Sequence, residues 1–190
     1  YNQISLDIPP AAFDETVSVS ISSPGSAPAG NGGLQGLGSP ILVDISALNG
    51  LLQKLQPKKA VTLTMDYSSA SLTGVNENAL VIATYNTARS LWVPLRSERN
   101  ALTKKVTAKT DHFSLFQLMK AVTGSVISGV TVGPNPLRPV KNPGQEFVFR
   151  NLPSGAGVKI YTYLGELIFE TTADAAGIAA WNGRNKAGRQ

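Results

Sequence analysis

The segment KKAVTLTMDY, residues 58–67, decides the class of fold that we expect for this chain. From Val61 to Met65, apolar and polar residues alternate strictly, which is typical of a β-strand with one buried and one solvent-facing side. Segments with strand-like patterns recur at residues 4–8, 17–21, 41–45, 79–85, 90–95, 105–119, 127–132, 146–150, 158–163 and 167–172. The sequence therefore predicts an all-β fold.

The composition also fits many short strands joined by turns. Gly occurs 18 times and Pro 12 times in 190 residues, and charged residues make up only 15%. Residues 22–40 are dominated by Gly, Ser, Ala and Pro, so we predict a long loop there. Residues 48–55, LNGLLQKL, show the only helical spacing, and Gly50 and Pro57 limit it to a short helix at most.

A domain boundary is predicted near residue 120. The stretch KAVTGS, residues 120–125, is small, polar and unpatterned, as a linker would be. We predict two β-sandwich domains in tandem, at residues 1–120 and 126–190, with a linker at 121–125. Alternation assigns inward-facing positions in both domains, namely Leu6, Ile8, Val61, Leu63, Trp92, Phe116, Phe149, Ile160 and Trp181.

Charge and cysteine usage argue against several classes of function. The net charge is +5, but the basic residues are scattered and lie beside no ladder of aromatic residues, so a solvated surface is favoured over nucleic-acid binding. The absence of cysteine excludes disulfides and thiolate metal sites. There is no apolar run long enough to span a bilayer. The chain begins with Tyr rather than Met, which indicates a processed start or a fragment of a longer protein.

Five segments in order carry a resemblance to a known family. They are LDIPPAAF at 6–13, SPILVDIS at 39–46, KKAVTLTMDY at 58–67, LWVPL at 91–95 and VTAKTDHFSLFQLM at 106–119. This part of the chain resembles the ZU-five family, whose members are β-sandwich modules of ankyrins and netrin receptors, with many relatives in bacterial surface and secreted proteins. The resemblance implies a β-sandwich over nearly all of residues 4–119.

The second half carries a different resemblance. Its motifs are VGPNPLRP at 132–139, EFVFRNLP at 146–153, VKIYTYLGELIFE at 158–170 and WNGRNKAGRQ at 181–190. It resembles the immunoglobulin-like module of the flagellar hook-capping protein, which recurs as the terminal domain of secreted bacterial proteins. The resemblance implies one further closing strand after Gln190, so we expect this domain to lack its last strand.

The triplet His112, Phe113 and Ser114 is the only constellation with a nameable reaction. Some ZU-five members cleave themselves between Phe and Ser at this motif. The Ser hydroxyl attacks the preceding carbonyl while the His assists proton transfer, and water then hydrolyses the resulting ester. Because that reaction also needs backbone strain and a positioned water, we favour an intact structural segment over self-cleavage.

Other candidate sites receive ordinary structural interpretations. His112 is the only histidine, so we expect neither a hydrolase triad nor another catalytic site, and we predict no cofactor and no metal ion. The Asn and Asp residues of the C-terminal segments are expected to cap turns rather than bind calcium. Trp92 and Trp181 are expected in the core rather than on a glycan platform. Tyr161 and Tyr163 are expected to face outward and offer a contact surface.

The two ends suggest assembly. A sandwich without its last strand exposes backbone groups and apolar core. Residues 1–8, with Tyr1, Ile4, Leu6 and Ile8 as the donor positions, could fill that gap in a neighbouring copy and build an open fibre. Native sequence after Gln190 is the alternative, and we favour it over the fibre.

The leading functional hypothesis is a non-enzymatic, extracellular structural or interaction module of a secreted or cell-surface bacterial protein. The expected partners are neighbouring domains or other copies of the chain. Self-cleavage and glycan binding are the alternatives.

Overall fold

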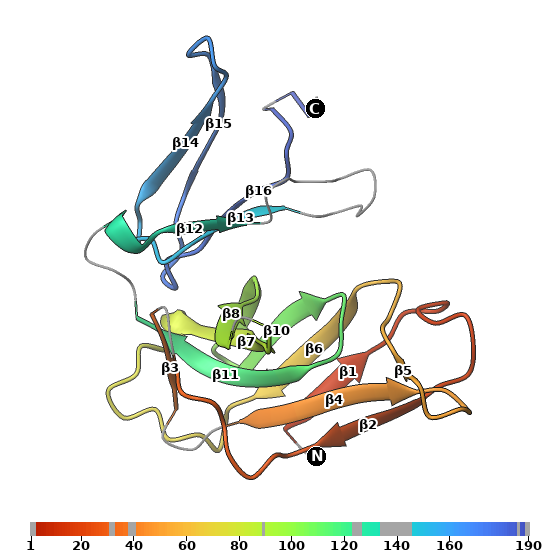
Figure 1. Ribbon diagram of the computed structural model, residues 1–190. Coiled ribbons are helices and arrows are strands. Elements are labelled where there is room, and N and C mark those ends of the chain that lie inside the picture. Colours follow the sequence, from red (N-terminus) through yellow and green to blue (C-terminus); the bar gives the residue numbers. More distant parts are fainter. Residues whose placement is uncertain are drawn as a thin grey trace. The chain divides into compact units, whose positions relative to one another are not determined.

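The computed structural model describes residues 3–30, 33–37, 41–88, 90–122, 127–133, 146–185 and 187–188. These residues form sixteen strands and two short 3-10 helices, so the prediction of an all-β fold is confirmed (Figure 1). Backbone contacts divide the chain into two compact units, Tyr1–Ala121 (unit 1) and Val122–Gln190 (unit 2). The tandem-domain boundary itself stays a prediction.

Unit 1 consists of two antiparallel sheets. The strands are β1 (Ile4–Asp7), β2 (Ser18–Ser22), β3 (Leu34–Gly36), β4 (Leu42–Leu48), β5 (Lys54–Leu55), β6 (Val61–Asp66), β7 (Leu80–Asn86), β8 (Leu91–Pro94), β9 (Ser97–Asn100), β10 (Lys105–Thr110) and β11 (Leu115–Ala121). The four-stranded sheet has the order β1-β6-β10-β9. The seven-stranded sheet has the order β2-β4-β11-β7-β8, with β3 paired to β11 and β5 paired to β4.

The core of unit 1 lies between these sheets. Val61, Leu63 and Met65 of β6 are fully buried, and so are Phe116 and Leu118 of β11. Residues of both sheets belong to one apolar cluster, which identifies the two sheets as the layers of a sandwich. The alternation in residues 61–65 thus correctly identified the buried face. Leu6 and Ile8 are only half-buried, because β1 is an edge strand at the margin of this cluster.

Trp92 is buried, as expected, but on the other face of the seven-stranded sheet. In the strand register Phe116 lies opposite Thr84, whereas Trp92 lies opposite Tyr85, and successive residues of a strand point to opposite faces. The tryptophan is 2% exposed, and its indole N–H donates to the carbonyl of Pro28 at 3.2 Å. The segment after β2 therefore covers this outer face of the sheet.

The structure adds to or differs from the sequence-based expectations in three places. Residues 22–40 contain β3, whose Leu34 is buried opposite Ala121 of β11, so this segment is not only a loop. Residues 48–55 form no helix, because Asn49 Oδ1 accepts the N–H groups of Leu51 and Gln53 and so stabilises a turn before β5. Strand β9 was missed because it is polar throughout and lies at a sheet edge.

Unit 2 is smaller. A 3-10 helix, η2 (Ile127–Gly129), precedes β12 (Thr131–Gly133), and the remaining strands are β13 (Phe147–Arg150), β14 (Gly157–Tyr161), β15 (Leu167–Thr172) and β16 (Ala179–Trp181). The strands form a three-stranded sheet, β12-β13-β16, and a two-stranded sheet, β14-β15. The Pro-rich residues 134–143 lie outside the described part of the chain.

The core of unit 2 is less complete than predicted. Leu152, Val158, Ala173 and Ala179 are buried, and Phe149 and Ile160 pack against them while remaining half-buried. Trp181 was expected to be buried, but it is also half-buried, because a three-stranded sheet covers its ring mainly by stacking on Phe147. The two ring centroids are 5.5 Å apart.

Replacing the buried tryptophan tests both the fold and the domain prediction. Trp92→Ala should lower the free energy of unfolding of unit 1 by roughly 3–5 kcal/mol, as large-to-small core changes do. Urea unfolding followed by circular dichroism measures this loss. Trp181 is then the only tryptophan and reports on unit 2, whose transition should not move. Trp92→Phe, which keeps most of the buried area, is the control. A joint shift of both transitions would contradict two independent domains.

Candidate functional site

The predicted self-cleavage triplet lies in the connection between β10 and β11. Phe113 is buried in the inter-sheet cluster, and its ring lies 6.1 Å from that of Phe13 between centroids. His112 and Ser114 flank it and remain partly exposed. The buried phenyl ring therefore anchors a segment whose neighbours reach solvent.

A side chain that the sequence did not single out holds the backbone of Phe113. Gln56 Oε1 accepts the Phe113 N–H at 2.5 Å, and Gln56 Nε2 donates to the Phe113 carbonyl at 3.1 Å. One carboxamide thus pairs with both polar groups of this residue. Gln56 lies far away in the sequence, just after β5, and nothing in its local pattern indicated this role.

The imidazole of His112 is held by groups other than Ser114. Its Nε2 lies 3.2 Å from Thr84 Oγ1, and its Nδ1 lies 2.9 Å from Asp111 Oδ1. The hydrogen bond with His112 holds the pKa of the Asp111 carboxyl below its ordinary value of 3.8. Thr110 Oγ1 also donates to the His112 carbonyl at 2.9 Å. These contacts fix the ring orientation.

Ser114 has partners of its own. Its hydroxyl donates to the Tyr85 carbonyl at 3.3 Å, and its carbonyl accepts the N–H of Ile45 at 3.0 Å. The described contacts therefore direct the hydroxyl proton to a carbonyl rather than to the imidazole. The non-glycine residues with positive φ are Ala11, Leu52, Ser90, Lys104 and Asn151, so the described backbone at 112–114 carries no left-handed strain. This geometry suits an intact, structural segment.

Two open hollows meet at the Phe113–Ser114 peptide. One, of about 440 Å³, is lined by polar side chains that include Asp44, Lys54 and Gln56. The other, of about 350 Å³, lies beside Thr84 and His112. Water therefore has access to the segment through both hollows, which are too open to enclose a small molecule.

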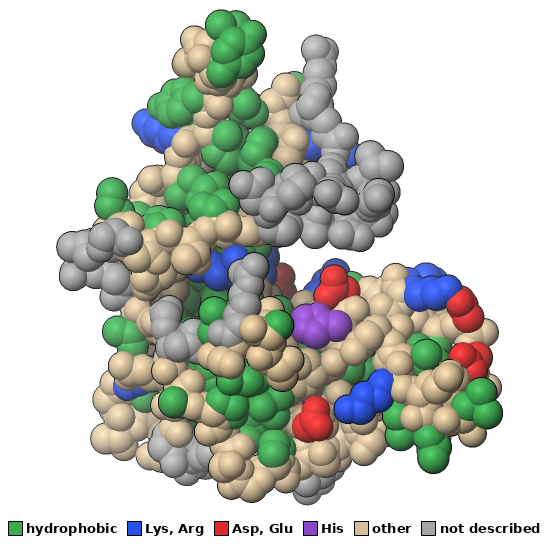
Figure 2. All heavy atoms as spheres, viewed as in Figure 1, with side chains coloured by type: hydrophobic (Ala, Val, Ile, Leu, Met, Phe, Trp, Pro, Cys, Tyr) green, Lys and Arg blue, Asp and Glu red, His purple; other side chains and the backbone are tan. Residues whose placement is uncertain are grey.

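The tip of the β14–β15 hairpin exposes large apolar side chains. Tyr163 is 97% exposed and Leu164 is 71% exposed, and Tyr161 and Leu167 beside them are also exposed. Figure 2 shows apolar side chains at the end of this hairpin. The predicted outward direction of Tyr161 and Tyr163 is confirmed.

The turn of this hairpin is well ordered by hydrogen bonds. The Thr162 N–H donates to the backbone carbonyl of Glu166 at 2.9 Å, and the Gly165 N–H donates to the backbone carbonyl of Thr162 at 3.0 Å. Gly165 has φ of +86°, a backbone conformation that side chains disfavour. The apolar tip is therefore presented by a defined turn.

The Asn and Asp residues of the last segments cap turns, as predicted. Asp174 Oδ1 accepts the N–H groups of Ala176 and Ile178, each at 2.9 Å. The side chains of Asn182 and Asn185 accept the N–H groups two residues further on. Among the residues that the structure describes, no group of three potential ligands could hold a metal ion.

The predicted donor strand is paired within its own chain. Ile4, Leu6 and the residues between them form β1, which pairs antiparallel with β6, and Ile8 directly follows. Tyr1 lies outside the described residues. Donation of this segment to a neighbouring copy stays a prediction, and it would require β1 to leave β6.

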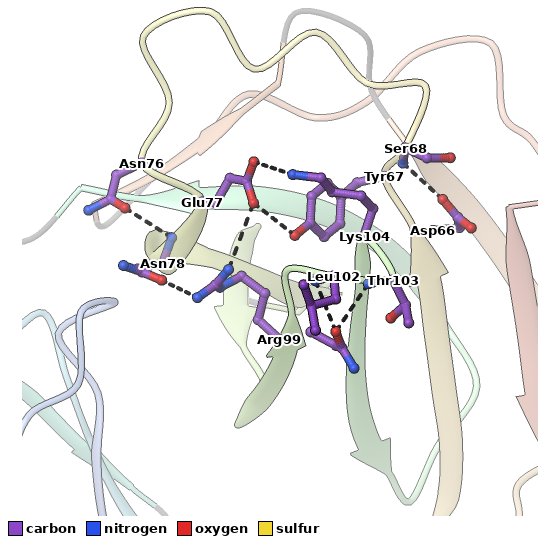
Figure 3. Close-up of polar contacts among 11 residues, drawn as sticks. Asp66, Tyr67, Ser68, Asn76, Glu77, Asn78, Arg99, Leu102, Thr103 and Lys104 are labelled. Carbon is purple, nitrogen blue, oxygen red and sulfur yellow. Dashed lines mark hydrogen bonds and ion pairs between the residues drawn. The ribbon is translucent and has the colours of Figure 1, made fainter.

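A charged network lies at the end of unit 1 that carries the β9–β10 turn (Figure 3). Glu77, in the 3-10 helix η1 (Glu77–Ala79), accepts hydrogen bonds from Lys104 Nζ at 2.7 Å and from the hydroxyl of buried Tyr67 at 3.2 Å. Arg99 of β9 lies 3.8 Å from the same carboxylate and donates to Asn78. The network ties η1 to the β9–β10 turn, so we assign it a structural role.

The pH dependence of stability follows from this network. The hydrogen bond from Lys104 holds the pKa of Glu77 below its ordinary value of 4.5. A lowered pKa in the folded state contributes stability above pH 4.5, and this contribution is lost as the pH falls through the folded value. Glu77→Gln should therefore lower the melting temperature at pH 7, and the difference from wild type should shrink below pH 4.5. A difference in melting temperature between wild type and Glu77→Gln that stayed constant down to about pH 2.5 would contradict a stabilising role of the Glu77 charge.

In the described part of the chain no helix is long and apolar enough to cross a membrane. Comparison of the chain with family models, curated proteins and solved structures gives no match. The two family resemblances stay predictions, and a function for the chain has to be inferred from the contacts of its described residues.

Proposed function

We propose that the chain is a non-enzymatic structural and interaction module of a secreted or cell-surface bacterial protein, and that the β14–β15 hairpin tip is its contact surface. The observation that carries the proposal is the exposure of four large apolar side chains in a seven-residue segment around one turn. They are Tyr161, Tyr163, Leu164 and Leu167. Single exposed apolar residues are common, whereas contiguous ones mark interaction sites.

The geometry of the tip suits recognition by contact. Burying apolar surface contributes about 25 cal/mol per Å², and tyrosine adds a hydroxyl that can find a polar partner. The hydrogen bonds around Thr162 and Gly165 hold the turn before any partner arrives, which reduces the entropy cost of binding. The location outside the cell rests on the two family resemblances.

The contacts of the only histidine support the non-enzymatic part of the proposal. Its ring nitrogens face Thr84 and Asp111, and the Ser114 hydroxyl faces the Tyr85 carbonyl. A nucleophile needs a base within hydrogen-bond reach, and this pairing is not made. Glycan stacking on both tryptophans is disfavoured because Trp92 is buried.

Self-cleavage is the second candidate function, and one contact favours it. Gln56 Nε2 donates to the Phe113 carbonyl oxygen, the atom on which negative charge would develop during attack by Ser114. We expect the chain to remain whole nevertheless. Intact mass spectrometry after days at pH 7–8 should give one full-length species, identical for wild type and Ser114→Ala. Fragments ending at Phe113 in wild type alone would establish cleavage.

A photo-cross-linking experiment tests the contact surface. A tagged chain with a photoreactive phenylalanine analogue at position 163 is expressed in the encoding organism, and its extracellular fraction is irradiated. We expect the tagged chain in that fraction and a discrete adduct, which Leu164→Ser should weaken because it removes one of the four exposed apolar side chains. The same analogue at exposed Leu102 of unit 1 is the matched control. Retention inside the cell, or equal adducts at both positions, would contradict the proposal.

A further inference from the structure

Among the strands that the structure describes, β2 pairs only with β4, and its other edge lacks the features that normally protect sheet edges. The other strands that end the two main sheet orders carry such features: β1 has Asp7, β9 has Glu98 and Arg99, and β8 has Pro94. The short strands β3 and β5 lie off these orders and pair with β11 and β4. Strand β2 reads Ser-Val-Ser-Ile-Ser, without a charge or a proline, and it is paired with β4 along its whole length. Native proteins rarely leave an edge of this kind open, because it is a template for another strand.

The backbone groups at this edge can be assigned. The Ile45 N–H donates to Ser114, so Ile45 points its backbone groups toward β11, and Ser46 therefore points toward β2. Ser46 lies opposite Ser20 in the register, so the N–H and carbonyl groups of Ser20 are used within the sheet. Those of Val19 and Ile21 point away from β4, to the open side.

The side chains at this edge are apolar on the face toward the core. Val19 and Ile21 lie opposite Ala47 and Ile45, two members of the inter-sheet cluster. Val19 is nevertheless 38% exposed, and Ile21 is only half-buried. Leu6 of edge strand β1, in the other sheet, is half-buried against the same cluster. The sandwich core is therefore incompletely covered along the flank formed by β1 and β2.

We propose that β2 pairs antiparallel with β2 of a second copy, about a two-fold axis at Ser20. In this register Val19 of one copy lies opposite Ile21 of the other, and their outward N–H and carbonyl groups pair at both positions. Both side chains point to the core face, so each copy extends the apolar layer of its partner. The two seven-stranded sheets become continuous across the axis.

Self-complementarity is the reason for choosing a second copy as the occupant. Strand β2 alternates serine with β-branched residues. This pattern is the same in both directions, as an interface with two-fold symmetry requires. Strand β2 carries no charged residue, so no like charges meet within the paired segment. This surface differs from the hairpin tip, and the inference does not depend on the proposed function.

Sedimentation velocity of the full chain from about 10 µM to 1 mM tests the association. We expect a monomer–dimer equilibrium, since a five-residue edge is a small interface. Val19→Lys should weaken the dimer about tenfold or more, because each lysine would then lie opposite the apolar Ile21 of the other copy, with the two like charges as diagonal neighbours on the same face. Ser5→Lys, at an exposed site on β1, adds the same charge and should leave the dimer unchanged. Strictly monomeric wild-type chain at 1 mM, or equal effects of both variants, would overturn the proposal.

Amide hydrogen exchange on the unmodified chain identifies the surface independently of any variant. In the monomer the outward N–H groups of Val19 and Ile21 should exchange fast, while that of Ser20 is protected by β4. Raising the concentration should slow exchange at Val19 and Ile21 and leave Ser20 unchanged. A dimer that forms without this change at Val19 and Ile21 would place the interface elsewhere and overturn the assignment.

Discussion

Packing between β6 and β11 across the sandwich is the interaction on which the rest of unit 1 depends. Leu63 and Phe116 are fully buried in one cluster that both sheets share. Removing such side chains would cost roughly 2–5 kcal/mol each, a large part of the stability of a small domain. Phe113 belongs to the same cluster, so this packing also positions His112 and Ser114 at the surface.

The same core explains which parts of the surface remain available for contact. At one end of unit 1, the Glu77 network ties η1 to the β9–β10 turn. Along the β1 and β2 flank, by contrast, apolar residues of the cluster remain partly exposed. In unit 2 the short sheets bury less, and its hairpin carries exposed tyrosine and leucine. A module that functions by contact needs such incompletely covered surfaces, whereas an enzyme needs convergent polar groups.

The fold class could be predicted from sequence because period-two alternation follows directly from one-sided burial, as in residues 61–65. The face that buries Trp92 could not, since a partner segment such as the one carrying Pro28 is set by long-range pairing. The outward direction of Tyr161 and Tyr163 followed from alternation, whereas the half-exposure of Trp181 did not. Gln56 was missed because its bonds to Phe113 join distant parts of the chain, and the open edge of β2 appears only once the strand order is known.

A single introduced cysteine tests most directly whether copies of the chain meet at β2. The chain has no cysteine, so Ser20→Cys gives one thiol per copy. In the proposed register the two positions form a non-hydrogen-bonded pair with Cα atoms about 4.5 Å apart, within the range that a disulfide spans. Mild oxidation should give a disulfide-linked dimer much faster than for Ser5→Cys on β1. Equal and slow cross-linking of the two variants would contradict the account.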